Sequence, residues 1–364
     1  MVRRPIVRRP PVGYDRAFLE GYAPGETWYL PPPLRRHLHQ LGRTPELGRP
    51  AGSHARDILD RLLIDLAWAS SRLEGNTYSR LDTQNLIEFG QRAEGKDAAE
   101  AQMILNHKNA IELLVDEGEH LRCDRRTILT LHAALSENLL SNPADEGRLR
   151  SRMVNITGAT FTPVAIPQVI EDCSDLLLNK VNAIDDPFEQ AFFMMVHIPY
   201  LQPFIDVNKR TSRLAANIPL IRDNLCPLSF VDVPERDYVE GTVAVYKLKR
   251  ITLLRDVFAW AYERSSSQYT VVREALGQPD PVRLRYRSQL EDVVRETVLG
   301  GAPPRRSTLE SWAEANGVDP RDRAPFAERA LDILLNLHEG SAGRYRIRPS
   351  DLRAWEEIHR TGGR

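Results

Sequence analysis

The sequence is short of the features that mark secreted, membrane-bound and nucleic-acid-binding proteins. Its 364 residues include 3 cysteines, Cys123, Cys173 and Cys226, which lie too far apart for a disulfide framework or a zinc site. No long apolar run is present to cross a membrane, and residues 1–11 are rich in Arg and Pro and lack the apolar core of a signal peptide. A net charge of -1 gives no overall attraction to nucleic acid or acidic lipid. We therefore expect a cytoplasmic protein without a membrane partner.

The composition that remains is that of an ordinary globular protein, 42% hydrophobic and 27% charged. Apolar residues recur at helical spacing along most of the chain. The pattern predicts helices at about 55–75, 83–91, 98–116, 125–140, 167–182, 187–199, 209–223, 235–246 and 251–264. Residues 153–163 combine β-branched and turn residues and predict a short β-hairpin. Because strands and helices do not alternate, we expect a mainly α fold rather than a doubly wound nucleotide-binding sheet.

Changes in composition predict four parts. Residues 1–50 form an Arg- and Pro-rich N-terminal arm, expected to be extended and either flexible or strapped across the next domain. Residues 51–265 form the main helical domain, residues 266–280 a linker containing Ser, Gly and Pro, and residues 281–364 a second helical module. In that module residues 344–348 predict a short strand with three arginines.

Polar and cationic residues follow the apolar helix predicted at 187–199. Asp206 offers a hard oxygen ligand suited to magnesium, and Asn208 offers an amide. Arg210 and Arg213 are three residues apart at the start of the next helix and so share one face. Free amides at a helix N-terminus attract phosphate. Chemistry alone leaves two interpretations open, a phosphate and metal cradle or a surface ion-pair cluster.

The run 202–213 closely resembles the Fic motif, His-Pro-Phe-x-Asp/Glu-Gly-Asn-Gly-Arg-x-x-Arg. Gln202 replaces the His, and Val207 and Lys209 replace the two glycines, so that six of nine defining positions match. The matching residues are Pro203, Phe204, Asp206, Asn208, Arg210 and Arg213. The resemblance implies a Fic-type helical bundle that binds ATP or another nucleotide with Mg²⁺. It places the nucleotide at Phe204, Asn208, Lys209, Arg210 and Arg213 and the metal at Asp206.

Three further segments, in family order, extend the resemblance to about residues 50–264. Residues 70–76 resemble the N-terminal inhibitory helix of Fic proteins, whose Glu, here Glu74, enters the nucleotide site and pairs with Arg213. Residues 235–238 resemble the segment whose Tyr, here Tyr238, lies beside the adenine. Residues 154–158 resemble the flap hairpin that pairs with the backbone of a target. The flap residues would be Val154, Ile156 and Gly158, and the target a protein or small molecule that the sequence does not name.

The departures from the motif bear on mechanism. In Fic enzymes the motif His takes a proton from the target hydroxyl that attacks the α-phosphate of ATP, and a carboxamide such as Gln202 does not titrate near neutral pH. His197 is more simply explained as a core or surface histidine than as a substitute base. Glu74 could act as a base in a hydrolytic role. Val207, being β-branched, disfavours the positive φ that a glycine allows, so we expect the loop to differ if the family turn needs that conformation.

These observations leave two classes of function open. The first is a Fic-type nucleotidyltransferase or hydrolase whose ordinary AMP transfer is impaired or changed, including removal of AMP from a modified protein with Glu74. The second is a non-catalytic, nucleotide-binding homologue that regulates or binds a partner. The resemblance also implies a homodimer. Some Fic proteins carry a C-terminal winged helix that contacts DNA, but 15 arginines against 13 acidic residues in 281–364 favour a protein-interaction or packing module.

Overall fold

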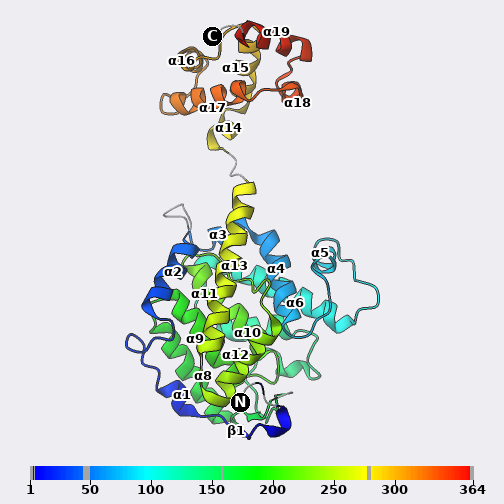
Figure 1. The fold of residues 1–364 in the computed structure, drawn as a ribbon, viewed down its shortest axis with the longest axis vertical. Coiled ribbons are helices and arrows are strands. Elements are labelled where there is room, and N and C mark those ends of the chain that lie inside the picture. Colours follow the sequence, from blue (N-terminus) through cyan, green and yellow to red (C-terminus); the bar gives the residue numbers. More distant parts are fainter. Residues whose placement is uncertain (1–2, 4, 44–49, 157–158, 277–279, 361–364) are drawn as a thin grey trace. The chain divides into compact units, whose positions relative to one another are not determined.

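The computed structural model describes residues 3, 5–43, 50–156, 159–276 and 280–360, and over these residues the chain is mainly helical (Figure 1). The mainly α fold predicted from the sequence is therefore confirmed. The chain divides into two units, Met1–Ala275 and Leu276–Arg364. Each has its own hydrophobic core.

The N-terminal unit is built around α9 (Pro187–Leu201), a helix in which every residue is buried. The helix begins at Asp186, whose carboxylate accepts hydrogen bonds from the backbone N–H groups of Phe188 and Glu189, both at 3.0 Å. Apolar side chains on all sides of α9 explain why other helices surround it. They are α2 (Pro32–Gly42), α8 (Pro167–Asn182), α10 (Asn208–Ala215), α11 (Asn217–Arg222) and α12 (Glu235–Leu248). Figure 1 shows α8 to α12 gathered within this unit.

A second group of helices brings the predicted inhibitory segment to α10. In it α4 (Leu59–Arg72) packs on α6 (Ala98–Glu117), α6 packs on α7 (Arg125–Ser136), and both α4 and α7 contact α10. The helix predicted at about 55–75 is α3 (Ser53–Asp57) and α4, separated at Ile58. The helix predicted at 209–223 is likewise α10 and α11. A further helix, α5 (Arg80–Phe89), follows the turn after α4, where Gly75 takes a φ of 90°.

The N-terminal arm straps the unit but is partly helical, unlike the extended chain that its composition predicts. It contains α1 (Arg16–Glu20) and the whole of α2, and its apolar residues Leu19, Tyr22, Leu30 and Leu38 are at most 1% exposed. The buried carboxylate of Glu189 holds it by accepting hydrogen bonds from the Tyr22 hydroxyl at 2.9 Å and the Leu30 N–H at 2.9 Å. A few apolar residues decide this packing, and the overall Arg and Pro content of the arm does not reveal them.

The small sheet pairs distant segments. Strand β1 (Val12–Gly13) lies parallel to β2 (Phe161–Thr162), with Val12 opposite Phe161 and Gly13 opposite Thr162. Within the described part of 153–163, β2 pairs with the arm and not with a neighbouring strand, which corrects the predicted hairpin there, while residues 157–158 lie outside the described residues. The ammonium of Lys247 donates to the carbonyl oxygens of Pro10 and Thr160, both at 2.6 Å, and so joins the two segments. Local turn residues cannot reveal such a long-range bond.

The C-terminal unit follows α13 (Thr252–Leu276), which continues through the first part of the linker predicted at 266–280. Its helices are α14 (Pro281–Arg285), α15 (Arg287–Leu299), α16 (Arg306–Ala315), α17 (Arg323–Leu335), α18 (Glu339–Ala342) and α19 (Pro349–Arg360). The strand predicted at 344–348 is wrong. A short 3-10 turn, Gly343–Tyr345, takes its place, and Arg346 with a φ of 55° ends it. Among residues 280–360 no strand is present that could form a wing.

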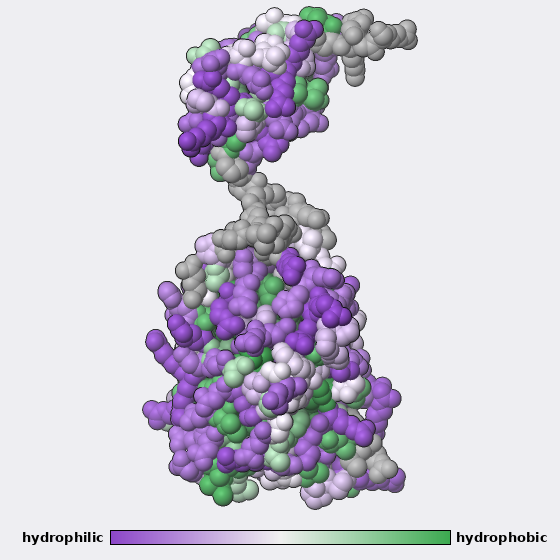
Figure 2. All heavy atoms as spheres, turned by 90° about the vertical axis from the view of Figure 1, so that its left-hand side faces the viewer, coloured by the Kyte–Doolittle hydropathy of each residue, from purple (hydrophilic) through white to green (hydrophobic). Residues whose placement is uncertain are grey.

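The surface is polar. Hydrophilic residues cover most of the visible face of each unit, with small apolar patches between them (Figure 2). No helix in the described ranges has both the length and the apolar character needed to span a membrane.

Candidate nucleotide site

The α9–α10 turn, residues 202–208, is fixed by its own side chains. Gln202 ends α9 in a left-handed conformation with a φ of 52°. The amide of Asn208 accepts a hydrogen bond from the N–H of Phe204 at 2.9 Å and donates one to the Phe204 carbonyl at 3.0 Å. Phe204 is buried and stacks on His132, with 3.8 Å between ring centres. The turn therefore needs no ligand to hold its shape.

The side chain of Gln202 is part of this internal bonding. Its amide nitrogen donates to the Pro199 carbonyl at 2.8 Å and to the Tyr246 hydroxyl at 3.3 Å. Its amide oxygen accepts from Asn208 at 2.9 Å. Both ends of a group that does not titrate are thus engaged, and Gln202 supplies no proton acceptor to the site.

Val207 retains a left-handed turn despite its branched side chain. Its φ is 64° and its ψ is 6°, so the loop does not avoid a positive φ at this position, contrary to the expectation for a β-branched residue. A left-handed conformation costs an ordinary residue about 1–2 kcal/mol. The Val207 side chain is only 2% exposed, and its burial offsets that cost.

The start of α10 offers unpaired donors. The backbone N–H groups of Asn208, Lys209 and Arg210 have no hydrogen-bond acceptor within the described parts of the chain. The first turn of a helix leaves such groups free, and together with the helix dipole they favour an anion.

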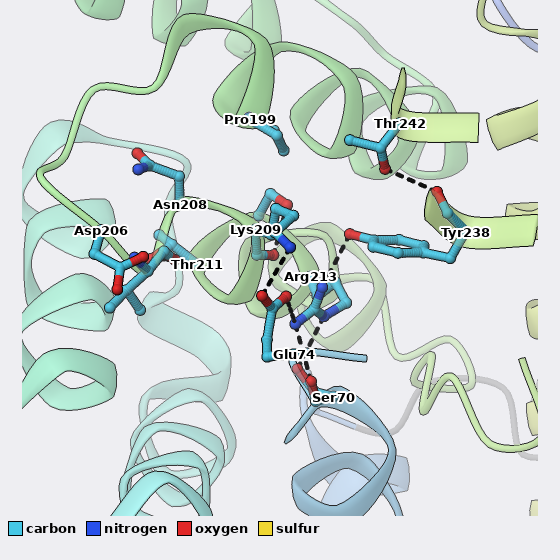
Figure 3. Close-up of polar contacts among 12 residues, drawn as sticks. Ser70, Glu74, Pro199, Asp206, Asn208, Lys209, Thr211, Arg213, Tyr238 and Thr242 are labelled. Carbon is cyan, nitrogen blue, oxygen red and sulfur yellow. Dashed lines mark hydrogen bonds and ion pairs between the residues drawn. The ribbon is translucent and has the colours of Figure 1, made fainter. Parts of the chain in front are cut away.

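Arg213 joins α10 to the turn after α4 (Figure 3). Its guanidinium is fully buried and donates to the Tyr238 hydroxyl at 3.0 Å, the Ser70 hydroxyl at 2.9 Å and the Ser70 carbonyl at 3.0 Å. It also bonds a Glu74 carboxylate oxygen at 2.7 Å. The fold thus brings together Glu74, Arg213 and Tyr238, which lie up to 164 residues apart in the sequence.

Glu74 is held by a second cation. The other oxygen of its carboxylate lies 2.8 Å from the Lys209 ammonium (Figure 3). Burial opposes ionisation of Glu74, but Arg213 and Lys209 outweigh it and lower the pKa of the carboxyl to about 2. Glu74 is therefore a carboxylate at neutral pH and a poor base. The replacement of a motif glycine by Lys209 adds a contact that the resemblance did not predict.

Arg210 is the unsatisfied group of the site. Its side chain is 6% exposed, and its Nη1 nitrogen is buried without a hydrogen-bond partner among the described residues. Burial lowers the pKa of Arg210, although Glu74 and Asp206 act against this. A buried charged donor without an acceptor costs at least about 1–3 kcal/mol. An anion that accepts its hydrogen bonds would remove that cost.

Asp206 is the exposed carboxylate at the edge of the turn, and one of its oxygens accepts a hydrogen bond from the N–H of Val207 at 2.7 Å. Within the described ranges no group of three His, Cys, Asp or Glu side chains could hold a metal ion. A metal bound by protein groups alone does not fit. Mg²⁺ often takes one or two carboxylates and completes its shell with water and phosphate oxygens, and Asp206 fits that mode.

The predicted flap residues Val154 and Ile156 are half-buried, and Gly158 lies outside the described residues. Arg150, which sequence reasoning missed, ties the turn to this segment. Its N–H donates to the Pro203 carbonyl at 2.9 Å, and its guanidinium donates to the Gln202 carbonyl at 2.7 Å. Arg148, Arg150 and Arg152 alternate along this loop, and nothing in that pattern singles out Arg150 for such a role.

Three buried histidines lie on α6, α7 and α9, and none replaces the missing base. Burial lowers the pKa of His107 to about 3, of His132 to about 4 and of His197 to about 3. His107 bonds the Ser70 hydroxyl at 2.9 Å. His197 bonds the Tyr29 hydroxyl at 2.9 Å, as expected for a core histidine. Sequence reasoning missed His107, although its position between Ile104 and Ile111 on an apolar helix face indicated that it would be buried.

Comparison with known proteins gives this site its context. Residues 122–220 match the family model described as "Fic/DOC family". Residues 122–220 therefore correspond to a Fic/DOC-family domain. Its α9–α10 turn lies inside the matched range, whereas Glu74 and Tyr238 lie outside it.

The relatives of this Fic domain are named as protein adenylyltransferases. The "Protein adenylyltransferase fic-1" of Caenorhabditis elegans is 30% identical over 162 residues, which cover 43% of this chain and 31% of the relative. The "Protein adenylyltransferase Fic" of Nematostella vectensis is 27% identical over 197 residues, which cover 52% of this chain and 45% of the relative. The matches thus span less than half of either relative.

Solved structures share the fold. Fic-1 (residues 134–508) from C. elegans aligns with a TM-score of 0.51 and 22% identity, over 66% of this chain and 69% of that one. A Fic family protein from Desulfovibrio desulfuricans G20 aligns with a TM-score of 0.55 and 19% identity, over 85% of this chain and 92% of that one. At these identities the likeness concerns the fold alone.

Proposed function

We propose that this chain binds a nucleoside triphosphate, ATP in the first instance, with Mg²⁺ at the α9–α10 turn, and that ordinary AMP transfer is impaired. The observation that carries the proposal is Arg210. Its buried Nη1 has no hydrogen-bond partner among the residues that the structure describes. It stands in the first turn of α10, where three backbone N–H groups have no acceptor within the same described residues. Phosphate oxygens would satisfy all of these donors. The adenylyltransferase relatives support ATP as the nucleotide.

Glu74 would regulate this binding. It neutralises Arg213 and Lys209, the two cations that a terminal phosphate would otherwise meet. Withdrawal of Glu74 would free both, while Asp206 would hold the Mg²⁺ that bridges the phosphates. Phe204 and Asn208 would act by fixing the turn, and Tyr238 would stay against Arg213 beside the nucleotide base.

Binding is better supported than transfer. Loss of a general base lowers the rate about 10²–10⁴-fold. Both ends of the Gln202 amide form hydrogen bonds within the turn, to Pro199 and from Asn208. The buried His197 is bonded to Tyr29, and Glu74 is paired with two cations. These contacts favour the non-catalytic, regulatory or partner-binding alternative over a hydrolase that uses Glu74 as its base.

Calorimetric titration of MgATP into the full chain tests the proposal. We expect Glu74→Gln, and equally Glu74→Gly, to bind about tenfold or more tightly than the wild type, because a charge-assisted hydrogen bond of about 1.5–3 kcal/mol no longer competes. Adding Arg210→Ala should cancel that gain. Glu88→Gln, which neutralises an exposed carboxylate on α5, is the matched control and should leave affinity unchanged. No binding at millimolar MgATP in wild type and both Glu74 variants would refute the proposal.

A further inference from the structure

A second hollow lies against α12 and α13 and shares no lining residue with the α9–α10 turn. Its volume is about 460 Å³. Apolar side chains contributed by α13 form part of its wall, among them Leu253, which is 46% exposed, and Trp260, which is 39% exposed. The lining residues are Arg3, Pro234, Asp237, Glu240, Leu253, Asp256, Val257 and Trp260. Exposed Leu and Trp beside a hollow suggest a recognition surface.

Three carboxylates surround this apolar wall. Asp237 and Glu240 come from α12, and Asp256 comes from α13. Asp237 forms no ion pair with any residue that the structure describes, and Asp256 lies 3.4 Å from the guanidinium of Arg255, its neighbour in the chain. The hollow therefore combines an aromatic ring with negative charge that is only partly neutralised, and this combination favours a cationic ligand.

The arm already places one cation there. The Nε of Arg3 lies 2.9 Å from a carboxylate oxygen of Glu240, while 74% of the Arg3 side chain stays exposed. The other oxygen of Glu240 is bonded by Arg236 at 2.9 Å. Arg255 pairs with Asp256, and Arg264 lies 5.9 Å from the centre of the Trp260 ring, so Asp237 is the lining carboxylate without an ion pair among the described residues. The arm thus provides one example of a guanidinium bound to a carboxylate of the hollow and leaves the rest of the hollow unfilled.

We propose that the α12–α13 hollow is a docking site for an extended segment of another protein that is rich in arginine and proline. Guanidinium groups pair with carboxylates in a fixed fork geometry and stack on aromatic rings. Proline keeps such a segment extended and lowers the entropy lost on binding. The arm has this composition, with Arg-Arg-Pro at 3–5 and again at 8–10, so Arg3 competes with the partner for Glu240.

A synthetic peptide with the sequence of residues 1–11 is the probe, titrated by calorimetry into the full chain carrying Arg3→Ala. We expect saturable binding that weakens as salt rises from about 50 to about 300 mM. In an Arg3→Ala background, Asp237→Asn with Asp256→Asn should weaken it at least about tenfold, the cost of losing two charge-assisted contacts. Wild type, in which Arg3 competes, should bind a few-fold more weakly than Arg3→Ala by the same reasoning.

The control keeps the charge change and moves it elsewhere. The control variant is Glu171→Gln with Asp175→Asn, two surface carboxylates of α8 that form ion pairs with Arg125. In the Arg3→Ala background it should leave peptide binding unchanged. A peptide with all four arginines replaced by alanine and its prolines kept should fail to bind. The proposal is overturned if Arg3→Ala does not bind the probe at millimolar concentration, or if the neutralised hollow or the alanine peptide binds equally well.

Discussion

Gln202 and Val207 replace two residues of the Fic motif with different results. Val207 occupies a glycine position, yet it adopts the positive φ and buries its side chain, so the turn survives. Gln202 keeps the turn as well, through hydrogen bonds to Pro199 and Asn208, but removes the group that would accept a proton. At this scale the two residues give a turn that is held by its own hydrogen bonds and packing, and Gln202 offers it no group that titrates near neutral pH.

Restoring the base should therefore restore transfer. Gln202→His combined with Glu74→Gly should label protein from ATP carrying radioactive α-phosphate about 10²–10⁴ times faster than Glu74→Gly alone. The reaction mixture should contain a cell lysate as well as the full chain, so that both self-modification and target modification are detected. Gln202→Asn in the same background is the control and should stay inactive. A Gln202→His variant that binds MgATP but labels nothing would show that the turn itself is incompetent.

Individual residues differ in how far the sequence reveals them. Glu74, Arg213 and Tyr238 stand in motifs with a fixed spacing, so a family resemblance in the sequence alone places them together. His107 and Arg150 act through contacts to distant segments, His107 to Ser70 and Arg150 to the carbonyls of Gln202 and Pro203. No local pattern encodes such pairs, because they exist only after the helices have packed.

The link between α4 and α10 is the feature that matters at the scale of elements. The turn after α4 meets α10 through Glu74, and α4 meets it through Ser70. The buried Asp65 anchors α4 elsewhere, accepting hydrogen bonds from Arg80 on α5 at 2.9 Å and from Gln268 on α13 at 3.1 Å. The predicted inhibitory segment is thus tied to α10 directly and to α5 and α13 through α4, and its Glu74 faces the proposed phosphate site.

Acid should loosen this link. The folded-state pKa of Glu74 is about 2, below an unfolded value of about 4.3. Its ionisation therefore stabilises the fold above about pH 4.3 and ceases to do so as pH falls toward 2. Urea unfolding should show Glu74→Gln to be less stable than wild type by about 1–3 kcal/mol at pH 7, with the difference shrinking over that acid range.

Lys209→Ala separates the effect of Lys209 on Glu74 from that of Arg213. Because one of the two cations is lost, the substitution should raise the pKa of Glu74. The difference in unfolding free energy between Lys209→Ala and the double variant Lys209→Ala with Glu74→Gln should therefore disappear at a higher pH than the same difference in the wild-type background. Glu88→Gln should change stability by no more than about 0.5 kcal/mol at any pH. A Glu74→Gln difference that does not vary between pH 7 and pH 2 would contradict an ionised Glu74 in the fold.

Elements were easier to predict where periodicity is continuous. The helix predicted at 167–182 matches α8, and the one at 98–116 differs from α6 by a single residue, because apolar spacing and capping agree there. The arm and the hairpin were harder. Burial of Leu19 and Leu30 and the pairing of Val12 with Phe161 depend on residues far along the chain, which local propensity does not sense.

On the scale of the whole molecule, the C-terminal unit has a hydrophobic core of its own, and its paired arginines do not favour nucleic-acid binding. Its core includes Phe326, Val294 and Leu352, separate from the core of the N-terminal unit. Several of its arginines are paired with carboxylates of the same unit. Arg285 lies 2.6 Å from Asp322, and Arg283 lies 3.1 Å from Asp332. Cations neutralised in this way contribute less to phosphate binding.

The full chain should therefore not shift random double-stranded DNA at micromolar protein and about 0.15 M salt, conditions under which dedicated DNA-binding proteins still bind. Lowering the salt to about 0.05 M should produce at most a weak shift, since the net charge of residues 281–364 is only +2. Arg344, Arg346 and Arg348 are the cations that the sequence singles out, and their triple replacement by alanine should change nothing in this assay. A strong, salt-sensitive shift that this replacement abolishes would instead assign the C-terminal unit to DNA and reject the protein-interaction or packing role.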